Sequence, residues 1–435
     1  METEPLRAIL RRAPQGDPCG RTAVLRLPVE QPIAILPTAK SKTGVALYAI
    51  YSRSRCATRS RLMIVLRIVL VVLGILLVVW PFLSAARTFV VPRSQPQKLN
   101  TFLFRSNRHF FDMLARRQET YEQKDRLMAL YAPLTLLMLV PLWLLITAAG
   151  YSFIYWALGI RPWTEAFISS GSSLLTLGYA SYDSFLFHLL SFSEAVIGLM
   201  LVAMLIAYLP TMYSAVSRRE RAVALLEVRA GWPPTAPELL WRLKGMDMNA
   251  AEQKAFWNSW EEWFTEIDET HTSLPALAFF RSPRPNLSWV VSAGVVLDGA
   301  ALALSLLEDD TSVATKSVVI RAGFLALRRI AESFNLPYDP DPHFPENEIS
   351  VTRAEFDAAC KRLAAQGLPL KEDLDLAWQN FGGWRVNYDE TLAALAQLTM
   401  APETPWLGEM TLVRADPAAG ETGAQLVSVE GGDGL

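Results

Sequence analysis

Three long apolar segments dominate the pattern of hydrophobic and polar residues along the chain. Residues 62–84 have about the 20 apolar positions that a helix needs to cross the hydrocarbon of a bilayer. Residues 127–160 contain no charged side chain. As one straight helix they would exceed the bilayer core, because each residue adds ~1.5 Å. A third apolar segment follows at 185–214. We predict transmembrane helices at 62–84, 127–150 and 185–214, with Gly150 breaking the second.

A shorter and more polar stretch lies between the second and third apolar segments. Residues 164–175 fit an amphipathic helix too short to cross a membrane, with Thr164 as its N-cap. The next five residues, 176–180, read Thr-Leu-Gly-Tyr-Ala. Non-helical backbone is tolerated at membrane depth only where protein buries it or where it lines a water-filled path. This stretch therefore predicts a re-entrant loop, with the negative end of the helix dipole directed at that path.

The chain after the third apolar segment has the pattern of a helical soluble domain, residues 218–402. Aromatic and aliphatic side chains recur at helical spacing in 250–270, which favours a stripe facing a core over a binding platform. Residues 286–307 are apolar but contain Asp298 near their centre, so we predict a buried helix there rather than a fourth span. No alternation with a period of two residues is sustained, which indicates an all-α fold. The composition of 403–435 predicts a disordered tail.

The distribution of charge predicts the topology. Residues 1–214 contain 22 Lys and Arg against 11 Asp and Glu, whereas residues 215–435 contain 19 against 32. The basic loop 86–126 should lie on the cytoplasmic side by the positive-inside rule, as should the arginines directly after the third helix. We therefore expect a multi-pass protein of the plasma (inner) membrane whose acidic C-terminal domain is cytoplasmic.

The first 61 residues admit three interpretations. They contain 11 Lys and Arg against four acidic residues, together with several prolines. Residues 1–61 can be a basic disordered leader or a targeting segment, since such composition occurs in transit peptides. The third interpretation is a start at Met63, which would remove an excess of positive charge from the outer side of the membrane.

The sequence carries no motif for catalysis, metal binding or nucleotide binding. Its three cysteines and four histidines are scattered, and no CxxC spacing occurs. An acidic run at 339–348 differs from a calcium-binding EF-hand loop, because Phe344 and Ser350 occupy the positions of the required glycine and final acid. No phosphate-binding loop, dinucleotide fingerprint or nucleophile motif is present. We predict no enzymatic activity, no cofactor, no metal beyond a permeating cation and no nucleic-acid partner.

Residues 127–220 resemble the pore region of potassium channels, where an outer helix, a pore helix, a selectivity filter and an inner helix follow one another. The pentapeptide 176–180 matches the family's TxGYG filter, whose backbone carbonyls replace the water around the ion. Leu177 replaces the usual Val or Ile, and Ala180 replaces the final Gly. The implied filter residues are Thr176, Leu177, Gly178, Tyr179 and Ala180.

The resemblance implies the pore-forming subunit of a homotetrameric channel for K⁺ or another monovalent cation, because one filter loop per chain requires four chains to close a ring. Three residues of the inner helix are further candidates. Gly198 is a gating hinge or a packing glycine. Glu194 is an intramembrane acid that hydrogen-bonds behind the filter or attracts cations, or an interfacial acid exposed to water. Pro210 loosens the helix near its cytoplasmic end. The alternatives are a membrane-anchored helical signalling or scaffold protein without conduction, and a cation transporter subunit. The predicted partners are the lipid membrane and further copies of the chain.

Overall fold

The protein is an all-α membrane protein. A computed structural model describes residues 42–89, 98–180, 184–246, 248–284, 287–308, 312–402 and 406, without the side chains of 42–60 and 98. About 79% of the described structure is helical, and the described residues contain no strand. The predicted tail at 403–435 lies outside the described residues apart from Trp406, as do residues 1–41 of the predicted leader.

In the part of the chain that the structure describes, four helical segments are long and apolar enough to cross a membrane. They are Arg61–Phe89, Tyr121–Leu158, Phe185–Ala230 and Trp289–Leu306, with mean hydropathy of 3.2, 2.1, 2.3 and 1.8. The fourth differs in its surroundings, because 83% of its apolar window is buried within the protein, compared with 11% in the first. This fourth segment is the helix that the sequence predicted to be buried at 286–307, and its burial confirms that prediction.

Several helix bounds differ from those expected. Helix α2 (Lys42–Phe89) begins inside the segment predicted as a leader. The segment 86–126, expected to be a loop, contains α3 (Lys98–Ala115) and most of α4 (Tyr121–Ala129). Helix α5 (Tyr131–Leu158) continues through Gly150 instead of breaking there, and α7 (Phe185–Ala230) extends well beyond residue 214.

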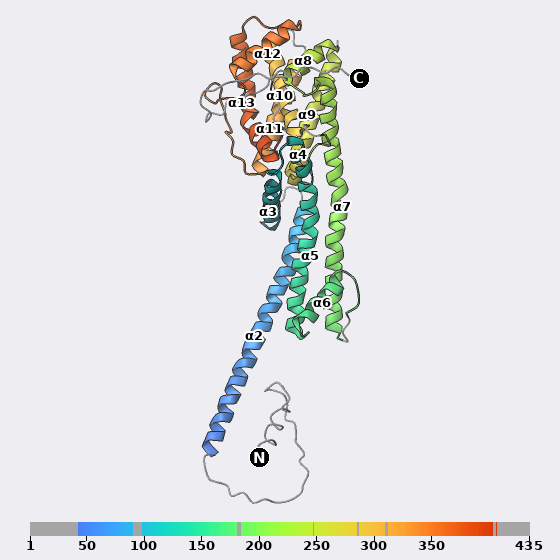
Figure 1. Cartoon of the computed structure of the whole chain (residues 1–435), viewed down its shortest axis with the longest axis vertical. Coiled ribbons are helices and arrows are strands. Elements are labelled where there is room, and N and C mark those ends of the chain that lie inside the picture. Colours follow the sequence, from blue (N-terminus) through green and yellow to red (C-terminus); the bar gives the residue numbers. More distant parts are fainter. Residues whose placement is uncertain are drawn as a thin grey trace, which may run out of the picture. The chain divides into compact units, whose positions relative to one another are not determined.

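The chain divides into two compact units. Unit 1 comprises Met1–Trp80 and Leu145–Val196, and unit 2 comprises Pro81–Leu144 and Ile197–Leu435, so α2, α5 and α7 each contribute to both. In unit 1 the short helix α6 (Trp163–Leu174) lies between its segments of α5 and α7 (Figure 1). Unit 1 contains the predicted re-entrant loop.

Two glycines bring α2 and α5 together in unit 1. A Cβ atom on Gly74 would lie 2.6 Å from the carbonyl oxygen of Gly150, and one on Gly150 would lie 2.8 Å from the carbonyl oxygen of Gly74. Small residues allow this close approach of two helix backbones, which is a common way for membrane helices to pack. Gly150 is therefore a packing residue, and the predicted break at this position was wrong.

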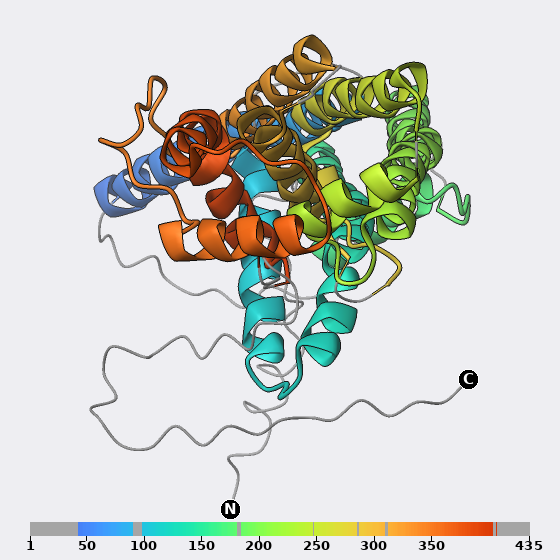
Figure 2. The same ribbon diagram turned by 90° about the horizontal axis from the view of Figure 1, so that it is seen from above.

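Unit 2 is built around a buried helix, α10 (Trp289–Leu306). Helices α8 (Ala236–Gly245), α11 (Val313–Ser333) and α13 (Leu374–Thr399) pack against α10, and α11 also packs on α9 (Ala250–Ser273). Figure 2 shows this group together with α12 (Arg353–Ala365) and the neighbouring pair α3 and α4. The predicted apolar stripe of α9 faces the core, which confirms that prediction. Its buried members include Phe256, Trp257, Trp260, Trp263, Phe264 and Ile267.

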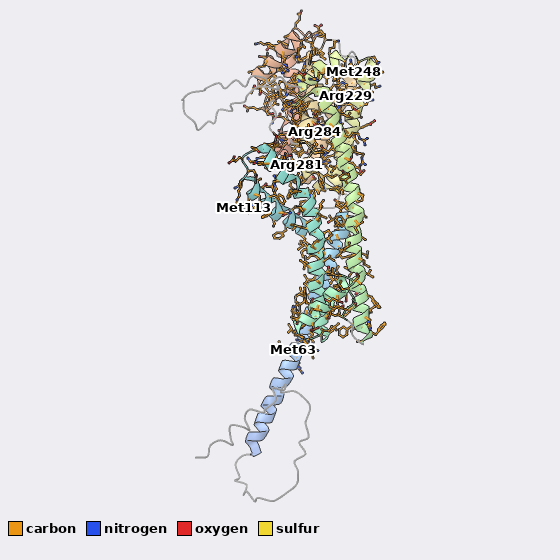
Figure 3. The ribbon with its side chains drawn as sticks, turned by 45° about the vertical axis from the view of Figure 1, so that its right-hand side comes forward. Met63, Met113, Arg229, Met248, Arg281 and Arg284 are labelled. Atoms are coloured by element: carbon orange, nitrogen blue, oxygen red, sulfur yellow. The ribbon has the colours of Figure 1, made fainter. Side chains whose placement is uncertain are left out.

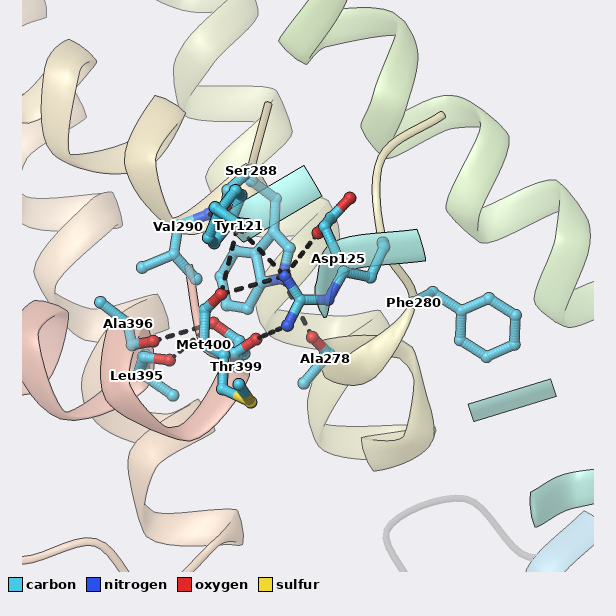
Figure 4. Close-up of polar contacts among 12 residues, drawn as sticks. Tyr121, Asp125, Ala278, Phe280, Ser288, Val290, Leu395, Ala396, Thr399 and Met400 are labelled. Atoms are coloured by element: carbon cyan, nitrogen blue, oxygen red, sulfur yellow. Dashed lines mark hydrogen bonds and ion pairs between the residues drawn. The ribbon is translucent and has the colours of Figure 1, made fainter. Parts of the chain in front are cut away.

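One largely buried arginine joins distant parts of unit 2. Arg281 donates to Asp125 of α4 at 2.7 Å, to the carbonyl oxygen of Thr399 at 2.6 Å and to that of Met400 at 3.0 Å (Figure 4). The carbonyls at the C-terminal end of α13 lack helical partners, and a cation at this end is favoured by the helix dipole. Arg284, on the same loop, forms an ion pair with Glu227, and its side chain is 67% exposed. Both arginines are labelled in Figure 3.

A second buried cluster surrounds Arg219 in α7. Its guanidinium donates to the carbonyl oxygens of Leu277 at 2.9 Å and Phe280 at 2.7 Å, and it pairs with Glu220. Nε2 of His271 lies 3.2 Å from the same guanidinium. Burial, together with the charge of Arg219, lowers the pKa of His271 well below its usual value. His271 is therefore neutral in the folded protein near pH 7.

Candidate functional site

Helix α6 delivers the predicted filter loop. It begins at Trp163 after Pro162, which occupies the N-cap without a side-chain hydrogen bond. Thr164 lies inside the helix, so the prediction that it forms the cap was wrong. Four serines occupy the second half of α6 and are buried, namely Ser169, Ser170, Ser172 and Ser173. Small hydroxyl side chains at these positions let α6 pack closely against its neighbours and supply hydrogen bonds to them.

The backbone of the loop 176–180 folds back onto the end of α6. The amide of Thr176 donates to the carbonyl oxygen of Ser173 at 3.0 Å. The amides of Leu177 and Gly178 donate to the carbonyl oxygen of Ser172 at 2.8 and 3.3 Å. The amide of Ala180 donates to the hydroxyl of Ser172 at 3.1 Å. Four of the five loop amides are therefore directed at the last turn of α6.

The direction of these amides determines the direction of the loop carbonyls. In a trans peptide the N–H of one residue and the C=O of the preceding residue point opposite ways. The carbonyls of Leu175, Thr176, Leu177 and Tyr179 thus point away from the last turn of α6. Thr176 and Gly178 have φ angles of 55° and 73°, so left-handed residues alternate with others along the loop. Such alternation turns successive N–H groups to one side of the chain.

The loop backbone has a conformation that favours glycine at residue 178 but not at residue 180. Gly178 has the positive φ that side chains with a Cβ disfavour, as the TxGYG resemblance implies. Thr176 also has a positive φ, which is uncommon for a β-branched residue and indicates local strain. Ala180 is not among the residues with positive φ. A Cβ atom at residue 180 is therefore compatible with this backbone.

Two large side chains of the loop are solvent-accessible in the single chain. Leu177 is 60% exposed and Tyr179 is 64% exposed. Thr176 and Gly178 are exposed as well, whereas Ser172, whose oxygens hold the loop amides, is fully buried. The loop thus has one side fixed to the protein and another that no described residue covers.

Glu194 of α7 is fully buried and ties three helices together. Its carboxylate accepts a hydrogen bond from the hydroxyl of Ser170 in α6 and another from Tyr155 in α5 at 3.1 Å. Ser170 also donates to the carbonyl oxygen of Ala148 at 3.1 Å. This arrangement matches the predicted hydrogen bond behind the loop, and cation attraction by Glu194 stays a prediction.

Further polar contacts reinforce the same junction. The hydroxyls of Ser173 in α6 and Ser191 in α7 lie 2.8 Å apart, and those of Tyr151 in α5 and Ser193 in α7 also lie 2.8 Å apart. Hydrogen bonds between helices hold membrane bundles together where hydrophobic driving force is small. The first pair fixes α6 against α7, and the second fixes α5 against α7.

The remaining inner-helix candidates lie within an unbroken helix. Gly198 is buried and Pro210 is exposed, and α7 continues past both to Ala230. Their roles in gating stay predictions.

Sequence reasoning found Glu194 and residues 176–180 but missed the residues that hold them. Ser172 anchors the loop, and Ser170 and Tyr155 anchor Glu194. A cluster of serines in a short helix between two apolar segments is the signal that points to such residues. It does not identify the partner of each hydroxyl.

Comparison with known proteins adds no family assignment. No protein-family model, curated protein or solved structure matches this chain.

Proposed function

We propose that the chain is the pore-forming subunit of a tetrameric cation channel that conducts through the loop 176–180. The observation that carries the proposal is the orientation of the loop, whose amides donate to Ser172 and Ser173. Its carbonyls are thereby left to face the opposite side. Backbone carbonyls replace the hydration shell of a cation without a fixed charge, so the ion is bound and can still leave.

The number of subunits follows from the number of loops. One chain supplies one set of carbonyls, and a closed ring around an ion requires several sets arranged by symmetry. Four copies is the arrangement that the resemblance to potassium channels implies. The exposed Leu177 and Tyr179 side chains would be covered by neighbouring copies in such a ring.

Potassium is the ion that the TxGYG resemblance favours. The substitution of Ala180 for glycine does not count against a pore, because residue 180 does not need a positive φ in this backbone. The basic segment 86–126 and the arginines near residue 218 favour a cytoplasmic position for the C-terminal domain and residence in the plasma membrane.

Cation flux into proteoliposomes tests the proposal. The wild type should conduct K⁺, and Gly178→Asp should abolish the flux, since it places a side chain on a left-handed residue and an anion beside the carbonyls. Gly171→Ala is the matched control, because its Cβ would meet no atom within 4 Å and conduction should persist. Absence of flux in the wild type, or equal flux in Gly178→Asp, would refute the proposal.

Selectivity is tested separately by reversal potentials. A potassium pore predicts a reversal potential that follows the K⁺ gradient when Na⁺ is on the other side. Equal permeability to the two ions would refute the potassium assignment and retain a general cation pore. Ala180→Gly should leave the permeability ratio largely unchanged if the backbone at residue 180 is already unstrained.

A further inference from the structure

Unit 2 contains a cavity of about 300 Å³ between α10 and α13. Aliphatic side chains form much of its wall, among them Val290, Val291 and Leu392. Its charged part consists of Asp298 from α10 with Arg385 and Asp389 from α13. A cavity of this size with an apolar wall and a few convergent polar groups has the character of a small-molecule site.

The charged part of the cavity is buried and well ordered by hydrogen bonds. Arg385 donates to Asp298 and, at 2.8 Å, to Asp389, and all three side chains are at most 11% exposed. Tyr388 donates to Asp298 at 2.7 Å, and Ser350 donates to Asp389 through both its hydroxyl and its amide. Burial alone would lower the pKa of Arg385, but the two carboxylates raise it, so this residue stays charged.

The balance of charge around the cavity is negative. Three carboxylates, Asp298, Asp389 and Glu355, line it together with one guanidinium, that of Arg385. An ionised carboxylate has about four acceptor sites. Asp298 and Asp389 each accept three of the hydrogen bonds described, which leaves acceptor capacity on both. A ligand that brings a positive charge and N–H donors would complement these groups.

An indole ring already occupies part of this site. Trp406 lines the cavity, and its indole N–H donates to Asp298 at 2.9 Å. The ring centroid of Trp406 lies 5.7 Å from that of Phe381. Trp406 follows the end of α13 in the chain, so its ring is an occupant supplied by the C-terminal segment. The site therefore accepts a flat aromatic ring beside a carboxylate.

We infer that this cavity binds a small aromatic amine, with its ammonium group at Asp298 and Asp389 and its ring in the place of the Trp406 indole. Trp406 then competes with the ligand for the cavity. The inference concerns ligand binding by unit 2 and does not depend on cation conduction by unit 1.

Isothermal titration of the purified full-length chain in detergent tests the inference with three probes that share one ring. Tryptamine carries a positive charge, tryptophan is a zwitterion and indole-3-acetate is negative. Tryptamine should bind most tightly and indole-3-acetate least, because the cavity carries excess negative charge. Trp406→Ala should tighten tryptamine binding by about tenfold, since a competing occupant lowers the apparent affinity by the fraction of open sites.

Two variants locate the binding. Ala393 lies at the cavity and is exposed, so Ala393→Phe should obstruct entry and abolish the heat of binding. Glu355→Gln removes one of the three carboxylates and should weaken tryptamine several-fold without affecting the buried ion pairs. Absence of tryptamine binding to Trp406→Ala would overturn the inference. So would affinity for indole-3-acetate equal to or above that for tryptamine, a result that requires only the wild type.

Discussion

Removal of the Glu194 carboxylate is the most informative perturbation of the region around the loop 176–180. Glu194→Ala deletes the acceptor for the hydroxyls of Ser170 and Tyr155, which are 0% and 1% exposed. Both hydroxyls would remain in the protein interior. Ser170 keeps its contact with the carbonyl oxygen of Ala148, whereas Tyr155 loses the hydrogen bond described for its hydroxyl.

The magnitude follows from the one orphaned donor, the hydroxyl of Tyr155. A buried polar group left without its partner costs about 1–3 kcal/mol. Even the lower figure shifts the equilibrium between docked and displaced α6 by about fivefold, because each 1.4 kcal/mol is a factor of ten. We expect Glu194→Ala to lower the thermal stability of the protein in detergent and to reduce K⁺ flux strongly.

Glu194→Gln separates hydrogen bonding from charge. The glutamine oxygen can accept from Ser170, and the amide nitrogen can donate to Tyr155, whose hydroxyl hydrogen is free to rotate. If Glu194 acts by holding α6, Glu194→Gln should retain most of the flux and stability of the wild type. If Glu194 attracts cations as an anion, Glu194→Gln should lose flux while keeping stability.

Rubidium or potassium flux into proteoliposomes, measured beside thermal denaturation of the same preparations, distinguishes these outcomes. Wild-type stability in Glu194→Ala would show that the hydroxyl of Tyr155 finds another partner and would refute the structural role. A loss of flux in Glu194→Gln equal to that in Glu194→Ala, at unchanged stability, would replace the hydrogen-bonding role by an electrostatic one.

Three further predictions concern stability, and thermal or chemical denaturation in detergent measures each. Gly150→Ala should cost about 1–3 kcal/mol by overpacking a helix contact, whereas Gly171→Ala, with open space at its Cβ, should be neutral or stabilising by up to about 1 kcal/mol. Arg281→Met leaves a carboxylate unpaired in a largely buried site and should cost about 3–5 kcal/mol, whereas Arg284→Met, at an exposed ion pair, should cost at most about 1 kcal/mol. The pKa of His271 is lowered in the folded state. As the pH falls below about 6.5, the unfolded chain therefore binds a proton that the folded chain does not. The free energy of unfolding should fall by about 1.4 kcal/mol between roughly pH 7.5 and pH 5.5. His271→Gln should lack that part of the pH dependence. Equal effects of Gly150→Ala and Gly171→Ala would contradict the packing role of Gly150, and equal effects of Arg281→Met and Arg284→Met would contradict the role of Arg281. An unchanged pH profile in His271→Gln would contradict the assignment of the pH dependence to His271.

The helical elements were predicted well because hydropathy and segment length can be read from neighbouring residues in the sequence. The apolar segment 62–84, the half-length helix 164–175 and the buried helix 286–307 all follow from hydropathy and length. The prediction of a break at Gly150 was wrong because glycine has two opposite effects in an apolar helix. It breaks the helix where the backbone turns, and it permits close packing where another backbone approaches, as that of Gly74 does.

Contacts between distant residues were beyond the reach of local patterns. The acid at Asp298 favoured a buried helix over a fourth span, but its partner Arg385 is 87 residues further along the chain. The same applies to Glu194 and Tyr155, which lie 39 residues apart. A buried acid signals that a partner exists, since an unpaired buried charge is costly, but the three-dimensional fold decides which residue provides it.

The orientation of the loop 176–180 depends on two serines that face opposite sides of α6. Ser170 and Ser172 are separated by about 200° around α6, because each residue turns a helix by about 100°. Ser170 contacts Glu194 and the carbonyl oxygen of Ala148, whereas Ser172 holds the loop amides. The contacts of Ser170 therefore fix the rotation of α6 about its axis, and that rotation determines where Ser172 presents its oxygens. The carbonyls of Thr176, Leu177 and Tyr179 thus take their direction from Glu194 through α6, although Glu194 makes no hydrogen bond to the loop among the contacts described. This dependence predicts that Glu194 affects the proposed conduction through the position of α6, and Glu194→Gln tests that role against direct attraction of cations.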